Sequence, residues 1–408
     1  MMRGGRIAVI GGGMSGMAAA ILLAKSGRQV VLLERQERIG KKLLLTGNGR
    51  CNISNTDMGT AHYRTDSADK LAQILSYCDA DTERAFWDDL GMEIREVKGG
   101  LYPMTNQAAT VLDCLRFRIE ELGVDVRTEV LAEQIRGSKG NFRILYRQTD
   151  GSRMTEDGFE SVLLGCGGLA GVYKEREQNG YLLTKQLDHT IRKGHPALVP
   201  VVCAEDMKAV AGVRVQAKVS LLHQEQYIAA DEGELQLTKD GISGIPVFQL
   251  TRYLDDLKDS VFEIDFLPYL EEKDLAEKIR NRYEAMRERT LEQFFAGWLQ
   301  KKLTLYLLKR FGIKADKCVE AVSLKQLNRL VSEMKHSRFV PTALGDYRQA
   351  QVSTGGIPLS EVDDTLESAK APGVYIMGEM LNVTGACGGY NLHFALATAH
   401  AAVCGLLQ

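Results

Sequence analysis

The sequence predicts an α/β protein in which a Rossmann-like domain, assembled from both ends of the chain, is interrupted by a β-rich domain and a small helical domain. Three observations predict this class. The apolar residues 7–10 run into a glycine turn and continue as a helix of small residues. A second apolar run, residues 28–34, ends on an acid. Residues 373–391 repeat the order of strand, glycine turn and helix near the other end of the chain.

The first expected element is a strand, a turn and a helix over residues 7–20. Gly11 permits the tight turn, Gly13 lets the backbone approach a pyrophosphate, and Gly16 lets the helix pack on the strand. The helix N-terminus adds free N–H groups and the positive end of the helix dipole. A GxGxxG turn alone is a weak signal, because an ordinary βαβ unit uses the same glycines. Our first candidates for cofactor binding are Gly11, Gly12, Gly13, Met14, Ser15 and Gly16.

The second expected strand ends on Glu34, which follows the glycine turn at a spacing of about 20 residues. An acid at this position bonds a ribose hydroxyl in dinucleotide-binding domains. It favours an adenosine ribose without a phosphate, as in FAD or NAD. With strand, helix and acid in place, nucleotide binding explains the pattern better than a βαβ unit without a ligand.

The composition excludes several classes of protein. The 408 residues suffice for two or three domains, and 45% hydrophobic with 25% charged residues is ordinary for a globular protein. A net charge of −2 excludes a uniformly basic coat for nucleic acid. The eight cysteines form no CxxC pair, so we expect a cytoplasmic protein without structural disulfides, zinc or another metal. No apolar run reaches the roughly 18 residues of a membrane span, so we expect no membrane contact.

A loop follows Glu34 and is too rich in glycine and asparagine to be helix or strand throughout. Its lysines can meet phosphate, and its glycine backbone can pass close to a planar ring. Paired Gly-Asn turns also occur in loops that bind nothing, but this loop follows a nucleotide-binding pattern. Its candidates for cofactor binding are Arg35, Lys41, Lys42, Thr46, Gly47, Asn48 and Gly49.

The middle of the chain changes character twice. Residues 66–122 read as largely helical, 123–133 as a further parallel strand, and 141–164 as an antiparallel excursion that ends in glycines including Gly167. Short strands then alternate with turns until residue 266, and a helical segment follows. The expected domains are 1–190 with 345–408 for the cofactor, 191–268 with about 338–352 for the β-rich domain, and 269–337 for the helical domain.

The helical segment carries a local positive charge. Residues 301–338 contain ten lysines or arginines and three acids. Such an excess suits a surface that faces RNA. It equally suits a solvated helical face, since aromatic residues are not interleaved with the charges.

The last segment returns to cofactor chemistry. A strand at residues 373–377 is followed by Gly378 and Glu379, and a second glycine turn then opens a helix. This order resembles the C-terminal half of two-dinucleotide-domain flavoproteins. In those proteins the acid bonds the ribityl chain, and the helix N-terminus stabilises the negative charge of the reduced flavin near N1.

Five motifs are more specific together than the glycine turn alone: GxGxxG, residues 45–52 (LTGNGRCN), 196–200 (PALVP), 353–357 (STGGI), and 378–379 with 388–391 (GE and GGYN). They resemble the BaiN-like (YhiN-like) family of flavoproteins over essentially the whole chain. The resemblance implies FAD, with Glu34 at the adenosine ribose, the backbone of Val130 at adenine and Glu379 at the ribityl chain. It also implies an isoalloxazine contact by Gly388, Gly389, Tyr390 and Asn391.

The resemblance implies reduction of an activated carbon–carbon double bond by FAD, with NADH or NADPH as the reductant. The first expected substrate is uracil in ribosomal RNA, held by residues 301–338, and the alternative is a small enone such as a steroid or bile acid. A third hypothesis is a flavin-loaded RNA-binding or redox-sensing protein without turnover. Cys387 and Cys51 are the candidate acids that protonate the second carbon, although a free cysteine is often only a packed residue.

Two departures from the family pattern bear on the substrate. The loop after Gly168 lacks the serine- and threonine-rich stretch that family members usually carry there. Position 382 is Asn and position 393 is His, where the family often has Asp and Gln. Both positions are expected near the flavin, so a shifted substrate is consistent with them.

Overall fold

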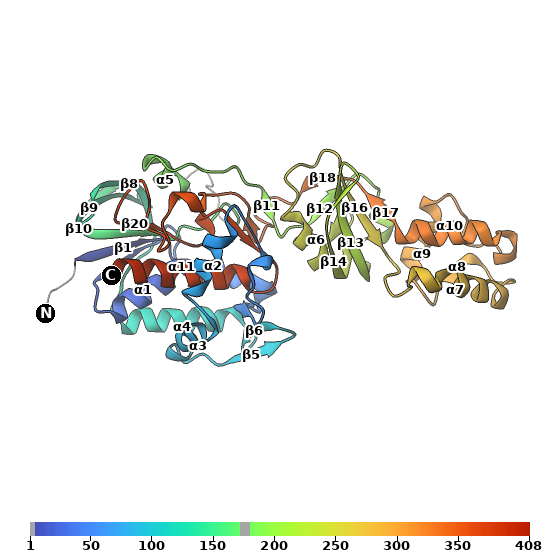
Figure 1. Ribbon diagram of the computed structural model, residues 1–408, viewed down its shortest axis with the longest axis horizontal. Coiled ribbons are helices and arrows are strands. Elements are labelled where there is room, and N and C mark those ends of the chain that lie inside the picture. The colour runs from blue at the N-terminus through green and yellow to red at the C-terminus, as the bar shows by residue number, and fades with distance from the viewer. Residues whose placement is uncertain (1–4, 172–179) are drawn as a thin grey trace. The chain divides into compact units, whose positions relative to one another are not determined.

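The computed structural model describes residues 5–171 and 180–408, and the chain divides into two compact units. Unit 1 comprises Met1–His195 and Gln351–Gln408, and unit 2 comprises Pro196–Ala350 (Figure 1). The expected boundaries near residues 190 and 345 lie close to this division. The β-rich and helical segments, which differ in their sequence patterns, form one unit with one hydrophobic core.

Unit 1 is built on a seven-stranded sheet. Parallel pairing joins β7, β2, β1, β10 and β20, and an antiparallel meander of β9 and β8 extends the sheet from β10. Its strands are β1 (Arg6–Ile10), β2 (Val30–Leu33), β7 (Asp125–Arg127), β8 (Val130–Ser138), β9 (Asn141–Gln148), β10 (Arg153–Leu164) and β20 (Val374–Ile376). Of these, β1, β2, β20 and the end of β10 are buried apolar runs, as expected for parallel strands covered by helices.

Helices α1 (Met14–Lys25) and α11 (Tyr390–Leu407) lie side by side against this sheet, with α4 (Ala108–Glu121) beside α1 (Figure 1). Both helices are rich in buried alanine, which suits the close packing of two helices from opposite ends of the chain. The other helices of the unit are α2 (Ala68–Ser76), α3 (Ala80–Asp89) and α5 (Tyr181–Gln186). Its short helices are η1 (Leu43–Gly49), η2 (Thr60–His62), η5 (Leu359–Glu361) and η6 (Gly378–Met380).

Unit 1 also contains short strands outside its main sheet. A three-stranded sheet has the order β3 (Ser54–Asn55), β6 (Gly100–Pro103) and β5 (Ile94–Val97), and a two-stranded ribbon pairs β4 (Tyr63–Thr65) with β21 (Val383–Gly385). A further short strand is β19 (Val352–Ser353). The ribbon matters for the site, because it ties the N-terminal part of the chain to the turn that precedes α11.

Unit 2 contains an antiparallel seven-stranded sheet with helices α7–α10 packed at one end of it (Figure 1). The sheet order is β17 (Ser337–Phe339), β16 (Ser260–Asp265), β13 (Arg214–His223), β14 (Gln226–Leu237), β15 (Gly241–Ser243), β12 (Val201–Cys203) and β18 (Pro341–Leu344). The strand β11 (Pro196–Ala197) begins the unit. The helices are α6 (Ile245–Thr251), η3 (Lys208–Val210), α7 (Glu272–Ala285), α8 (Leu291–Phe295), α9 (Lys301–Arg310), η4 (Val319–Ala321) and α10 (Leu324–Lys335).

Candidate functional site

The carboxyl ends of four parallel strands meet at one edge of the unit 1 sheet. Ile10 pairs in register with Leu33 on one side and Leu164 on the other, and Leu164 pairs with Ile376. The loops after β1, β2, β10 and β20 therefore leave the sheet side by side, which is where open α/β sheets bind ligands. These are the loops in which most of the predicted cofactor residues lie.

The glycine turn after β1 forms an open cradle. A Cβ on Gly11, whose φ is +106°, would lie 2.4 Å from the carbonyl oxygen of Gly165, and a Cβ on Gly16 would lie 1.9 Å from that of Gly11. A Cβ on Gly13 would meet only the oxygen of Gly165, at 4.0 Å. Gly13 is also the N-cap of α1, and no side chain caps the free N–H groups there. The turn thus leaves space and hydrogen-bond donors for a pyrophosphate.

Glu34 is held beside this cradle. Its Oε2 accepts a hydrogen bond from the N–H of Gly12 at 2.7 Å, and its Oε1 accepts one from the N–H of Gln36 at 2.8 Å. Burial raises the pKa of Glu34, and these two backbone hydrogen bonds oppose the increase. The carboxylate is therefore fixed at the end of β2, where an acid bonds a ribose.

Two adjoining hollows lie beside Glu34, and their lining residues differ in polarity. One has apolar walls that include Ile10, Leu33, Val130 and Leu183, which suit a flat base such as adenine. The other has polar and small residues, including Gly12, Gly13, Arg35, Lys41, Lys42 and Gly167, which suit phosphate. The structure therefore brings most of the predicted adenosine and phosphate residues together.

Glu379, in η6, contacts residues at the edge of the polar hollow. Its Oε1 accepts hydrogen bonds from the N–H of Ser353 at 2.9 Å and from its hydroxyl at 3.2 Å, and its Oε2 forms an ion pair with Lys42. A Cβ on Gly168 would lie 2.3 Å from Ser353 Oγ and 2.6 Å from Glu379 Oε1, so a side chain there would displace this pair. Tyr181 of α5 donates from its hydroxyl to the carbonyl of Glu379 at 3.2 Å. Ser353 lies in the STGGI motif, but the sequence did not identify it as a partner of Glu379.

The predicted isoalloxazine residues form the turn that opens α11. Gly389 is its N-cap with a φ of +97°, and a Cβ there would lie 2.4 Å from the carbonyl oxygen of Ser54. The side-chain oxygen of Asn391 accepts the N–H of Gly385 at 2.9 Å, and its amide donates to the same residue's carbonyl at 3.0 Å. Asn55 donates to the carbonyl of Gly388 at 3.1 Å. This turn is rigid before any ligand binds.

A histidine and an aspartate beside this turn were missed by the sequence reasoning. Nε2 of His62 lies 2.8 Å from Oδ2 of Asp57, and the His62 ring stacks on Tyr390. The hydrogen bond from His62 is the main cause that lowers the pKa of Asp57. No sequence motif predicts this pair. Its contact with Tyr390 of α11 arises only because β4 pairs with β21.

The two candidate acids differ in accessibility. Cys387 is half-buried in the turn before α11. Cys51 follows η1 with no exposed surface, and burial raises its pKa to about 11. Burial also raises the pKa of Cys166, which lines both hollows, to about 12. All eight cysteines are free thiols.

The remaining predicted residues have structural roles or lie outside the described part. Met14 and Ser15 are buried in the first turn of α1, and the hydroxyl of Thr46 donates to the carbonyl of Leu43 at 2.6 Å. Gly49 ends η1. Gly47 and Asn48 lie within η1, but the side chain of Asn48 and the loop residues 172–179 are outside the described part of the chain.

His393 joins a buried polar cluster behind the turn. Its Nδ1 lies 3.2 Å from both Glu83 Oε2 and Ser54 Oγ, and Ser54 donates to Glu83 at 2.8 Å. Trp87 donates from its indole to the other Glu83 oxygen at 3.3 Å. None of these four residues is more than 5% exposed, so the cluster anchors α11 on β3 and α3.

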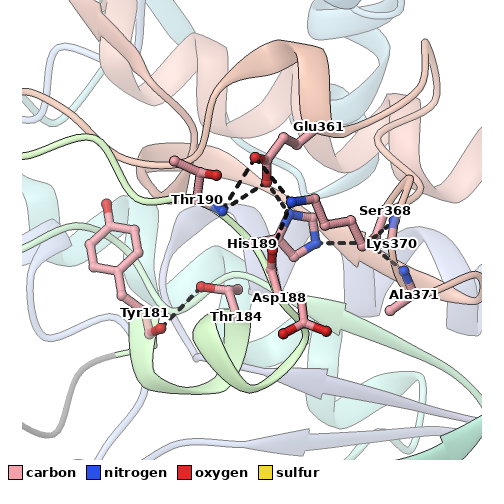
Figure 2. A network of polar contacts seen from close by, with 9 residues as sticks. All are labelled: Tyr181, Thr184, Asp188, His189, Thr190, Glu361, Ser368, Lys370 and Ala371. Carbon is pink, nitrogen blue, oxygen red and sulfur yellow. Dashed lines mark hydrogen bonds and ion pairs between the residues drawn. The ribbon is translucent and has the colours of Figure 1, made fainter.

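A second network, shown in Figure 2, joins the segment after α5 to η5 and the residues that follow it. His189 lies between Glu361 Oε2, 2.8 Å from Nδ1, and Ser368 Oγ, 2.7 Å from Nε2. Burial alone would raise the pKa of Glu361, but hydrogen bonds from Thr190, His189 and Lys370 lower it to about 2. Burial lowers the pKa of His189, although the hydrogen bond and the charge of Glu361 act to raise it. The network fixes the end of α5, the helix that contacts Glu379.

The basic segment 301–338 is extensively paired within unit 2. Five of its ten cations form ion pairs with acids, and Lys302 donates to the carbonyl of Ala211 at 3.2 Å. Lys335 is 6% exposed and serves the protein interior. Half of the cations are therefore paired with acids of the same unit. The paired cations are Lys301, Arg310, Arg329, Lys335 and Arg338.

Two general findings concern only the described residues. They contain no group of three or more histidine, cysteine or acidic side chains arranged to hold a metal ion. No helix among them combines the length and the apolarity needed to cross a membrane.

The model of the HI0933-like protein Rossmann domain matches residues 5–405. The chain belongs to the HI0933-like family. This family comprises flavin-dependent oxidoreductases of Rossmann type, which confirms the predicted family and the α/β fold with an inserted antiparallel sheet. The glycine turn after β1, the carboxylate of Glu34 and the apolar hollow beside it fit FAD.

The chain is similar over nearly its whole length to three named enzymes. The 3-dehydro-bile acid Δ(4,6)-reductase of Clostridium scindens is 36% identical, covering 97% of this chain and 98% of the relative. Ribosomal RNA dihydrouridine synthases of Escherichia coli and Haemophilus influenzae are 29% and 25% identical, each covering 96% of both chains. Among solved structures, a 3-ketosteroid-Δ4-(5α)-dehydrogenase of Rhodococcus jostii RHA1 superposes with a TM-score of 0.51 at 14% identity, covering 99% of this chain and 97% of that one. This last likeness shows the fold alone.

Proposed function

We propose that this protein reduces an activated carbon–carbon double bond of a small enone of the steroid or bile-acid class, with FAD as its cofactor and NADH or NADPH as the reductant. The observation that carries the proposal is the 36% identity to a bile-acid reductase over nearly both whole chains, against 25% and 29% to the RNA enzymes. The internal pairing of the basic segment supports the same choice, since it leaves less charge for RNA.

In this proposal each loop at the carboxyl edge of the sheet has one task. Glu34 binds the adenosine ribose, Gly13 and the N-terminus of α1 bind the pyrophosphate, and Glu379 binds the ribityl chain. FAD bound by these residues would supply hydride transfer from the nicotinamide to an electron-poor carbon. Lys42, now paired with Glu379, is close enough to the cradle to balance phosphate charge.

A cysteine thiol supplies the proton for the second carbon. Cys387 and Cys51 are the proposed acids, and the geometry favours Cys387, because Cys51 is fully buried with a raised pKa. The imidazole of His62 reaches water, since its side chain is 33% exposed, and Asp57 holds it beside Tyr390. His62 therefore restores a proton to this turn between turnovers.

A second candidate function is the reduction of uracil in ribosomal RNA. The likeness of the whole chain to two ribosomal RNA dihydrouridine synthases favours it. The same hydride and proton chemistry applies to both substrates, so the site alone does not decide between them.

Product analysis tests the proposal. The flavin-loaded protein is incubated without oxygen with NADH or NADPH and a 3-oxo-Δ4 bile acid, and the product is identified by mass spectrometry. We expect a product two hydrogens heavier, and a saturated 3-oxo acid serves as the unreactive control. Turnover of a uracil-containing ribosomal RNA fragment without turnover of the enone would favour the second candidate.

A further inference from the structure

Unit 2 contains a hollow with a volume of about 510 Å³, between the start of β13, the loop before α7 and the loop before α9. Ligand pockets commonly enclose roughly 300–1,000 Å³. Its lining includes the aromatic Tyr269 and Trp298 and the apolar Phe266 and Leu299. None of these residues has a part in the proposed function.

A buried lysine fixes the loop that carries Tyr269. Nζ of Lys335 contacts Asp265 Oδ2 at 2.6 Å and donates to the carbonyls of Leu267 at 3.0 Å and Leu270 at 2.9 Å. Lys335 is 6% exposed, so these contacts are shielded from water. The three contacts bracket Tyr269 in the sequence and hold its backbone in place.

The loop that carries Trp298 is fixed in another way. The guanidinium of Arg282 lies 5.2 Å from the centre of the Trp298 ring, and its Nε donates to the carbonyl of Phe294 at 2.7 Å. The rings of Phe294 and Trp298 meet edge to face with centres 5.7 Å apart. Both aromatic walls of the hollow are therefore set before a ligand arrives.

Tyr269 is 72% exposed despite its rigid loop. Polar groups with both donors and acceptors accompany it: Arg214 and Glu234 form an ion pair at 3.0 Å, and Gln216 and Gln300 also line the hollow. An exposed aromatic face beside a polar edge matches a planar ring that has hydrogen-bonding groups around its rim.

We propose that this hollow binds a nucleobase, with Tyr269 and Trp298 providing aromatic surfaces and the Arg214–Glu234 pair reading the base edge. Aromatic side chains stack on bases of any sequence, and arginine and glutamate are residues that hydrogen-bond base edges. A saturated steroid offers no such flat polar rim. The base belongs either to a nicotinamide dinucleotide or to unpaired RNA, and this inference is independent of the enone substrate.

Binding to the full-length, flavin-loaded protein tests this inference. AMP, UMP, NADH and a single-stranded RNA tetranucleotide are each titrated by calorimetry and by tryptophan fluorescence. The chain has two tryptophans, and the other, Trp87, is 1% exposed in unit 1, so Trp298 is the reporter of the hollow. Tyr269→Ala removes the exposed ring, and Tyr227→Ala is the matched control, since Tyr227 is 66% exposed on β14 outside the hollow.

We expect Tyr269→Ala to weaken binding about 5- to 150-fold, which corresponds to the loss of one stacked base. Tyr227→Ala leaves binding unchanged, and Glu234→Gln changes the preference between AMP and UMP. Tighter Tyr269-dependent binding of NADH identifies the dinucleotide as the source of the base, and tighter binding of the tetranucleotide identifies RNA. The inference is overturned if no nucleotide binds in a Tyr269-dependent manner, or if cholate occupies the hollow and nucleotides do not.

Discussion

The imidazole of His62 lies parallel to the phenol ring of Tyr390, with centres 4.5 Å apart and planes inclined by 17°. The ribbon of β4 and β21 produces this contact, and the N–H of Ala386 donates to the carbonyl of His62 at 2.9 Å. Asp57 holds the imidazole through Nε2 at 2.8 Å. Residues from opposite ends of the chain thus place an exchangeable proton beside the turn that the flavin is expected to meet.

Replacement of His62 tests its part in proton supply. His62→Gln keeps a polar side chain but removes the imidazole, and we expect steady-state enone reduction to slow by about 100-fold, because the proton of the turn is no longer restored between turnovers. Flavin reduction by NADH or NADPH is expected to keep its rate, because that step needs no proton from His62. Stopped-flow absorbance separates the two steps. His336→Gln, at a half-exposed histidine of unit 2, is the control, and equal rates in both variants would remove His62 from the mechanism.

Substitutions of Gly16 and Gly13 test folding and cofactor binding separately. A Cβ at position 16 would overlap the carbonyl of Gly11, so Gly16→Ala is expected to lower the melting temperature markedly. A Cβ at position 13 meets nothing closer than 4.0 Å, so Gly13→Ala is expected to fold normally. It nevertheless intrudes on the pyrophosphate, and we expect FAD affinity to fall at least tenfold. Full FAD occupancy in a folded Gly13→Ala protein would show that the pyrophosphate lies elsewhere.

The thiols are distinguished by their reactivity. Burial keeps Cys51 protonated, with a pKa of about 11, and unexposed, so iodoacetamide at pH 8 is expected to leave it unmodified in the folded protein. Cys387→Ser is expected to slow enone reduction about tenfold or more, since serine is a much weaker acid. Cys318→Ser, at a half-buried thiol of unit 2, serves as the control. Peptide mass spectrometry and single-turnover rates provide the readings, and a Cys51 adduct in folded protein would contradict the structure.

The network of Figure 2 predicts sensitivity to acid. The pKa of Glu361 is about 2 in the folded state, against an ordinary value of 4.5, so its stabilising contribution is present above pH 4.5 and is lost as the pH falls towards 2. The lowered pKa of His189 acts in the same direction below pH 6.5, because the unfolded chain then binds the proton more readily. Denaturant titrations from pH 7 to pH 3 measure the free energy of unfolding.

Glu361→Gln is expected to be less stable than the wild type at pH 7, and the difference is expected to shrink between pH 4.5 and pH 3. Glu121→Gln, at an exposed acid of α4 that pairs with Arg118, is the control with little effect. A pH-independent difference between the wild type and Glu361→Gln would mean that Glu361 is not ionised in the folded protein.

The parts of the site that the sequence predicted are local in the chain. Each of these parts follows a buried apolar run: the glycine turn, Glu34, and Gly378 with Glu379. The point where such a run stops indicates the end of the strand. The inserted antiparallel sheet was likewise visible as short strands separated by turns. Sequence patterns separated the helical segment from it, but a pattern does not show that both bury their apolar faces in one core.

The contacts that the sequence did not predict join distant residues. Ser353 and Glu379 lie on different segments, His189 and Glu361 are 172 positions apart, and Ser54 and His393 are 339 apart. Such pairs depend on which strands neighbour each other, for instance β10 between β1 and β20. One sequence without related sequences contains no signal for those neighbours.

Single-turnover reoxidation of the reduced protein tests the central claim most directly. The flavin-loaded protein is reduced with one equivalent of NADH or dithionite without oxygen and mixed with a 3-oxo-Δ4 bile acid or with a uracil-containing ribosomal RNA fragment, and flavin absorbance is followed. We predict rapid reoxidation by the enone, with one equivalent of saturated product, and little reoxidation by the RNA. Reoxidation by the RNA fragment alone, with the enone inert, would contradict the account.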